Sequence, residues 1–94
     1  MQNEVKEKAE KYRSLTEKAL GEIKMSEGLN SEKKAVAKDF LGMAKNYLED
    51  GKHFEEKGEL LTALAAFSYA HAWLDAGVRA RLFKAEDDQL FTLP

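Results

Sequence analysis

The hydrophobic positions of this chain recur every three or four residues, and this spacing predicts three helices. Residues 3–27 form an amphipathic segment whose other face carries alternating acidic and basic side chains. Residues 31–57 follow with one apolar seam, which comprises Val36, Phe40, Met43, Ala44, Tyr47, Gly51 and Phe54. Residues 60–84 form a third segment that is apolar on nearly every side, and residues 85–94 form a short C-terminal tail. Because the breaks between the segments are short, we expect an all-α fold, an antiparallel up-and-down three-helix bundle.

The breaks contain residues that end and start helices. Gly28 readily adopts the positive φ that closes a helix, and Asn30 or Ser31 can cap the next one. Residues 57–59 form a second, tighter break around a glycine. Gly51, in contrast, lies inside the apolar seam, where glycine costs about 1 kcal/mol relative to alanine. We therefore expect another helix to approach the backbone closely at Gly51.

The third helix carries two apolar stripes on roughly opposite sides. The main stripe comprises Leu60, Leu64, Phe67, His71, Leu74, Val78 and Leu82. The second stripe is rich in alanine and comprises Ala65, Ala66, Tyr69, Ala72, Trp73, Ala76, Ala80 and Phe83. Two neighbouring helices cover only about half of a helix's circumference, so the second stripe needs another cover. Either the tail folds back over it as a lid, or a second copy of the chain packs against it. As a third alternative, residues 89–94 of the tail serve as a recognition motif for a larger assembly.

Composition and charge narrow the classes of function. The 94 residues suffice for one domain, and the absence of cysteine excludes disulfides and cysteine-based zinc sites. The formal net charge is -2, with both signs interspersed, which argues against nucleic acid or anionic lipid as a partner. The first residues lack the apolar core of a secretory signal, and polar side chains interrupt the third helix too often for a membrane span. We expect a cytoplasmic protein.

Three polar residues on the third helix are candidates for chemistry. Ser68, His71 and Asp75 share one side of the helix, as a nucleophile, a base and an orienting acid would. A regular helix, however, leaves no free backbone amides for an oxyanion hole. We therefore expect no catalytic residue, and instead a buried polar cluster of His71, Asp75 and Tyr47.

Glu49 and His53, four residues apart on the second helix, form another pair of metal-ligand types beside His71 and Asp75. The hairpin of helices two and three separates the two pairs by about 12 Å along the axis, given a rise of about 1.5 Å per residue. A zinc site needs three or four converging ligands. We expect no metal site, and the scattered glycines form no phosphate-binding motif that would indicate a cofactor.

Residues 47–76 resemble a known family. The most specific part is Tyr-Ala-His-x-Trp-Leu-Asp-Ala over residues 69–76, preceded by YLEDGKHFEEKGE over residues 47–59 and followed by LFTLP at the end of the chain. On these residues the chain is similar to the archaeal domain-of-unknown-function family DUF357. The resemblance implies a three-helix up-and-down bundle and a cytoplasmic archaeal protein, with no activity, cofactor or catalytic residue attached. A weaker similarity to a single tetratricopeptide repeat indicates only close antiparallel packing, because the chain contains no second copy of the repeat.

The sequence favours a non-enzymatic helical interaction module that forms a homodimer or binds a helix of another protein. The expected contact residues are Tyr69, Trp73, Ala76, Ala80 and Phe83 on the second stripe. Aromatic anchors among small residues are typical of helix-to-helix contacts. The alternative is a small-molecule-binding or catalytic pocket around Tyr47, His71 and Asp75.

Overall fold

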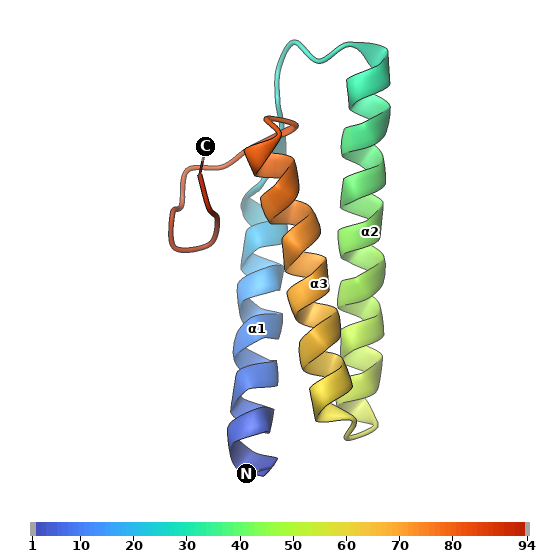
Figure 1. The fold of residues 1–94 in the computed structure, drawn as a ribbon, viewed down its shortest axis with the longest axis vertical. Coiled ribbons are helices and arrows are strands. Elements are labelled where there is room, and N and C mark those ends of the chain that lie inside the picture. Colours follow the sequence, from blue (N-terminus) through green and yellow to red (C-terminus); the bar gives the residue numbers. More distant parts are fainter. Residues whose placement is uncertain (1, 94) are drawn as a thin grey trace.

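The computed structural model describes residues 2–93 and shows an all-α, antiparallel bundle of three helices (Figure 1). The helices are α1 (Gln2–Glu22), α2 (Ser31–Glu56) and α3 (Leu60–Arg79). Two short strands, β1 (Lys24–Met25) and β2 (Phe83–Lys84), follow α1 and α3. The predicted fold class is confirmed, and Pro94 of the predicted tail lies outside the described residues.

Small residues allow α2 and α3 to pack closely. They recur every seven positions on both helices and are all buried: Ala37, Ala44 and Gly51 on α2, and Ala63, Ala70 and Gly77 on α3. A spacing of seven returns to the same side of a helix after two turns. At Gly51 an added Cβ would lie 2.5 Å from Cε1 of Phe67, a distance too short for two carbon atoms. The close approach expected at Gly51 is confirmed.

The buried side of α2 differs from the predicted seam. Ala37, Ala44, Leu48 and Gly51 are the buried residues of the helix, whereas Val36 of the predicted seam is 41% exposed. The larger side chains of that seam lie at the edge of the contact with α3, because only small residues fit where the two helices are closest. Ala44 and Gly51 of the predicted seam therefore belong to the core, and its larger side chains form the flank.

α1 lies mainly against α3 (Figure 1). Ala9, Thr16 and Ala19, which share one side of α1, are buried. The hydroxyl of Thr16 donates a hydrogen bond to the carbonyl oxygen of Phe67 at 3.3 Å, so its polar group is satisfied inside the core. The apolar stripe predicted for the first helix therefore faces α3.

Both α1 and α3 end earlier than the sequence predicted. α1 stops at Glu22 instead of residue 27, and α3 stops at Arg79 instead of residue 84. The residues that follow pair as antiparallel strands, with Lys24 opposite Lys84 and Met25 opposite Phe83. The amide of Ser26 extends this pairing by donating to the carbonyl oxygen of Leu82 at 2.9 Å. The ladder satisfies backbone groups that continued helices would have satisfied internally.

α2 and α3 end with the same capping geometry but with different residues. Gly58 follows α2 with φ +78°, and Arg81 follows α3 with φ 63°. In each case the amide of this residue and the amide of the next residue donate to carbonyl oxygens of the last helical turn, which is the Schellman motif. Glycine adopts a positive φ without strain, whereas arginine does not. At the start of α2, Oδ1 of Asn30 accepts a hydrogen bond from the amide of Lys33 at 2.8 Å, so Asn30 is the cap.

The C-terminal tail folds back against the bundle. Leu90 is 9% exposed and Phe91 is 4% exposed, and both belong to a core cluster that includes Ala19, Leu74 and Val78. In Figure 1 the tail forms a loop beside α1 and the end of α3. The tail is therefore a lid, although Tyr69, Ala72, Ala76 and Ala80 of the stripe for which a lid was predicted stay exposed.

Candidate interaction surfaces

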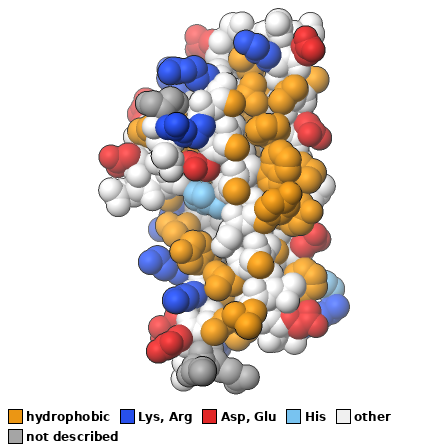
Figure 2. Space-filling view, in the orientation of Figure 1, with side chains coloured by type: hydrophobic (Ala, Val, Ile, Leu, Met, Phe, Trp, Pro, Cys, Tyr) orange, Lys and Arg blue, Asp and Glu red, His pale blue; other side chains and the backbone are white. Residues whose placement is uncertain are grey.

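Apolar side chains of α2 and α3 form one partly exposed surface, which we call the α2–α3 face. It comprises Val36, Phe40, Met43, Tyr47 and Phe54 of α2 and Ala65, Ala66, Tyr69, Ala72, Trp73 and Ala76 of α3. Figure 2 shows a band of hydrophobic side chains along this side of the molecule. Tyr69 is 47% exposed and Val36 is 41% exposed. The seam predicted for the second helix and the second stripe of the third helix thus lie side by side.

Aromatic rings hold the two halves of the α2–α3 face together. The ring centroids of Tyr47 and Tyr69 are 4.5 Å apart and nearly perpendicular, at 88°. Trp73 makes a similar edge-to-face contact with Phe40, at 5.0 Å and 77°, and a longer one with Tyr69. Such contacts contribute about 0.5–1.5 kcal/mol each beyond area burial. These contacts restrain the aromatic side chains of the α2–α3 face.

A shallow groove of about 410 Å³ crosses the lower part of the α2–α3 face. Its lining consists of Tyr47, Asp50, Phe54, Thr62, Ala65, Ala66 and Tyr69. Asp50 supplies the only charged side chain among these lining residues. The groove is thus a strip of apolar surface with a polar edge.

The predicted contact residues differ in exposure. Tyr69, Ala76 and Ala80 are exposed, Trp73 is half-buried against Phe40, and Phe83 is only 4% exposed. The placement of Phe83 on the exposed stripe is wrong. Because α3 ends at Arg79, Phe83 leaves the helical register and its ring packs over Gly77, where a Cβ would overlap it.

The predicted polar cluster of His71, Asp75 and Tyr47 is divided between two sides of α3. Nε2 of His71 donates to the carbonyl oxygen of Leu90 at 2.6 Å, and Oδ1 of Asp75 accepts from the amide of Thr92 at 2.6 Å. Tyr47 instead packs on Tyr69. Residues two positions apart point to nearly opposite sides of a helix, so Tyr69 and His71 lie on different surfaces. The geometry needed for the alternative, a pocket that unites the three side chains, is not present.

Arg79 joins His71 and Asp75 in holding the tail. Its Nη1 donates to the carbonyl oxygen of Leu93 at 3.0 Å. These three side chains, spaced by four residues along α3, form what we call the tail site. His71 and Asp75 were predicted as members of a polar cluster, and Arg79 was not predicted to join them. The spacing of four between polar residues on an apolar helix was the available signal.

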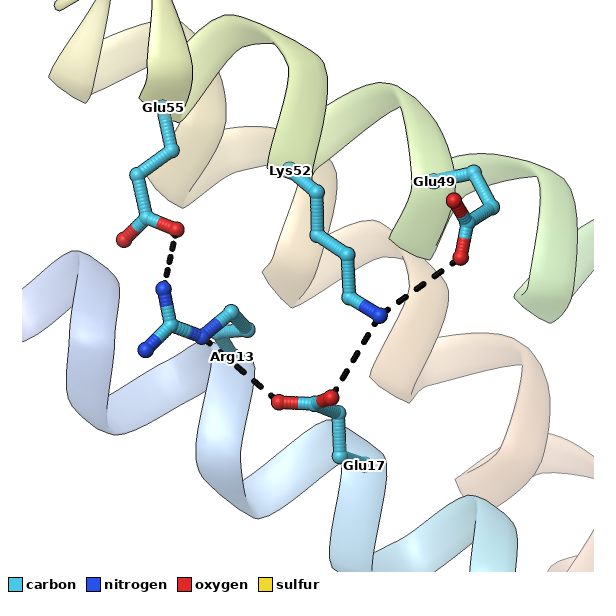
Figure 3. A network of polar contacts seen from close by, with 5 residues as sticks. All are labelled: Arg13, Glu17, Glu49, Lys52 and Glu55. Atoms are coloured by element: carbon cyan, nitrogen blue, oxygen red, sulfur yellow. Dashed lines mark hydrogen bonds and ion pairs between the residues drawn. The ribbon is translucent and has the colours of Figure 1, made fainter.

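The α1–α2 side of the bundle is charged, in contrast to the α2–α3 face (Figure 3). Arg13 of α1 pairs with Glu55 of α2 and with Glu17, and Lys52 of α2 pairs with Glu17 at 3.4 Å and Glu49 at 3.5 Å. Ion pairs between exposed side chains contribute about 0–1 kcal/mol each, so the two pairs of Lys52 add little stability. The Glu55 side chain is only 15% exposed, so its pair with Arg13 is partly buried between α1 and α2.

The other candidates from the sequence take ordinary structural places. The hydroxyl of Ser68 donates to the carbonyl oxygen of Leu64 in its own helix, at 2.9 Å. Glu49 belongs to the ion-pair network, and His53 is exposed. Across residues 2–93, no three His, Asp or Glu side chains are grouped so that they could hold a metal ion. None of the three helices has both the length and the apolar character needed to cross a membrane, over the same residues.

Comparisons with known proteins agree with the fold. The model of the DUF357 family, described as a protein of unknown function, matches residues 11–83. The crystal structure of protein AF1782 from Archaeoglobus fulgidus, which the same family model matches, superposes with a TM-score of 0.71 at 25% sequence identity. That alignment covers 90% of this chain and 97% of the Archaeoglobus chain. A search of curated proteins finds no match. The chain therefore belongs to the DUF357 family.

Proposed function

We propose that this chain is a non-enzymatic interaction module that pairs with a second copy of itself through the α2–α3 face. The observation that carries the proposal is the exposure of Tyr69, 47% of whose surface faces solvent although its ring is fixed against Tyr47. Rigid aromatic side chains on an exposed apolar surface supply contact area at low entropic cost.

The spacing of α3 residues supports a helix as the partner. Ala65, Tyr69, Ala72 and Ala76 follow one another at steps of four, three and four, which is the seam spacing of a two-helix contact. Small residues at these positions allow a second helix to approach closely, and Tyr69 supplies a side chain large enough to fill the space between. The seam carries no charged residue, so its burial would leave no unpaired charge.

The same seam is complementary to itself when two copies of α3 run antiparallel. A two-fold axis between Ala72 and Trp73 sets Tyr69 of one copy opposite Ala76 of the other, and Ala65 opposite Ala80. Each large residue then faces a small one, and the relation is repeated by symmetry. This size complementarity favours a second copy over an unrelated helix as the occupant.

The test is the molar mass in solution, measured by size-exclusion chromatography with light scattering from about 10 μM to 1 mM. We expect the wild-type chain to reach the mass of a dimer, and Ala76→Arg to remain monomeric because it places a charge in the seam, opposite Tyr69 of the other copy. Ala35→Arg is the matched control, since Ala35 is an exposed alanine of α2 outside the α2–α3 face. A wild-type chain that is monomeric throughout this range would refute the proposal.

A further inference from the structure

The tail site recognises main-chain groups. Along α3, His71 bonds the carbonyl of Leu90, Asp75 the amide of Thr92, and Arg79 the carbonyl of Leu93. Each contact comes from one turn further along the helix. Every residue other than proline carries the same amide and carbonyl, so these three bonds select a segment of a certain shape and direction.

The tail site also selects side chains, because it buries two apolar residues of the tail. Leu90 and Phe91 are almost completely buried, next to Ala19 of α1 and Leu74 of α3. The ring of His71 also stacks on that of Phe91, with centroids 6.0 Å apart and an angle of 28° between the planes. The site therefore fits a segment with two adjacent bulky apolar residues.

The connection between the tail and the bundle is short and irregular. Residues 85–87 are neither helix nor strand, and a turn follows at residues 88–90. The amide of Asp87 donates to Oε1 of Glu22 at 3.2 Å, and residues 86–88 are all acidic. None of the bonds in the tail site requires that the tail belong to the same molecule.

We propose that the tail site is a peptide-binding site, and that the tail of a second copy of the chain can occupy it in place of the chain's own tail. The chain's own tail has the advantage of a high effective concentration, so it fills the site at low protein concentration. The tail of a wild-type copy presents the same groups, and it becomes the occupant when the attached tail is weakened by substitution. The α2–α3 face lies on another side of α3, so this inference is independent of the proposed function.

The experiment uses the full chain, labelled with ¹⁵N, and a peptide of residues 86–94. The chain carries Leu90→Ala and Phe91→Ala, so that its own tail competes poorly. In a titration followed by NMR we expect saturable shifts of the α3 amides between His71 and Arg79. The dissociation constant should be at least tenfold lower than for the wild-type chain. If the double variant does not fold, Leu90→Ala alone weakens the tail and serves the same purpose.

Matched controls distinguish binding at the tail site from nonspecific binding of the peptide. A peptide that carries the same two alanine substitutions should cause no saturable shift. Adding Asp75→Ala to the chain should weaken binding about tenfold, because it removes the acceptor of the Thr92 amide. Ser68→Ala should leave binding unchanged, since Ser68 is on α3 but bonds only its own helix. Absence of saturation, shifts confined to the α2–α3 face, or equal dissociation constants for the wild-type chain and the variant would overturn the inference.

Discussion

Gly51→Ala is expected to destabilise the protein, although alanine is the better helix former. Gly51 is buried in the contact between α2 and α3. A Cβ at this position would lie 2.5 Å from Cε1 and 2.6 Å from Cδ1 of Phe67. Phe67 has no exposed surface, so its ring has no free space into which it could move. Either the ring leaves its rotamer or the two helices separate.

Two opposing terms set the size of the effect. Alanine gains about 1 kcal/mol of helix propensity over glycine. Overpacking a core costs about 1–3 kcal/mol, and we take the upper end because two ring atoms of Phe67 overlap the added carbon. The free energy of unfolding should therefore fall by about 2 kcal/mol. For a domain of this size, this corresponds to a decrease in Tm of about 8–16 °C.

Gly42→Ala is the matched control, since Gly42 lies on the same helix with nothing within 4 Å of an added Cβ. There the propensity term acts alone, and we expect the free energy of unfolding to rise by up to about 1 kcal/mol. Urea denaturation followed by circular dichroism measures both variants. Phe67→Leu should cost less in the Gly51→Ala background than in the wild-type chain, because it relieves the overlap. If Gly51→Ala proves as stable as Gly42→Ala, the account of the α2–α3 contact is wrong.

Five further substitutions test three other features. Arg81→Gly should raise the free energy of unfolding by about 1 kcal/mol in thermal melts, because glycine adopts the positive φ without strain. Gly58→Ala should lower the free energy of unfolding by a similar amount, and changes of the same sign in the two variants would contradict this account. Phe91→Ala should cost about 3 kcal/mol in urea denaturation, and a change below about 0.5 kcal/mol would mean that the tail does not pack. Asn30→Ala should cost about 1 kcal/mol by calorimetry, with Asn30→Asp near neutral if the cap is the reason.

The fold class could be predicted because helical periodicity is a local property of the sequence. The C-terminal ends of α1 and α3 could not be predicted, because they depend on contacts between distant residues. Met25 pairs with Phe83, 58 positions away, and this pairing replaces the last turns expected of both helices. The turn after α3 also gives no signal, since the residue with positive φ is Arg81 where a glycine would have marked the end.

The α2 seam was predicted only in part, because large apolar residues were weighted above small ones. Where two helices approach most closely, the contact is made by residues such as Ala44 and Ala70, and Phe40 and Tyr47 lie together on the flank that forms the α2–α3 face. A search for small residues at a spacing of seven would have found the core.

The tail site was predicted only in part, because its side chains bind main-chain atoms. His71 and Asp75 stood out as polar residues on an apolar helix, but their partners are main-chain atoms of the tail. Main-chain groups are the same at every position, so the sequence does not reveal which ones a side chain will bind. Tyr69, predicted as a contact residue on the second stripe, is 47% exposed, and its partner-binding role stays a prediction.

The tight turn at Gly58 has a consequence for the order of folding. α2 and α3 are neighbours in the chain, so their contacts require the closure of only a short loop, which is rapid. α1 docks after α3 has formed, because its docking contacts, such as that between Thr16 and Phe67, join residues 51 positions apart. We expect the α2–α3 hairpin to be formed in the transition state and α1 to dock late. Mutations at Ala44 should therefore slow folding, whereas mutations at Ala9 should mainly accelerate unfolding.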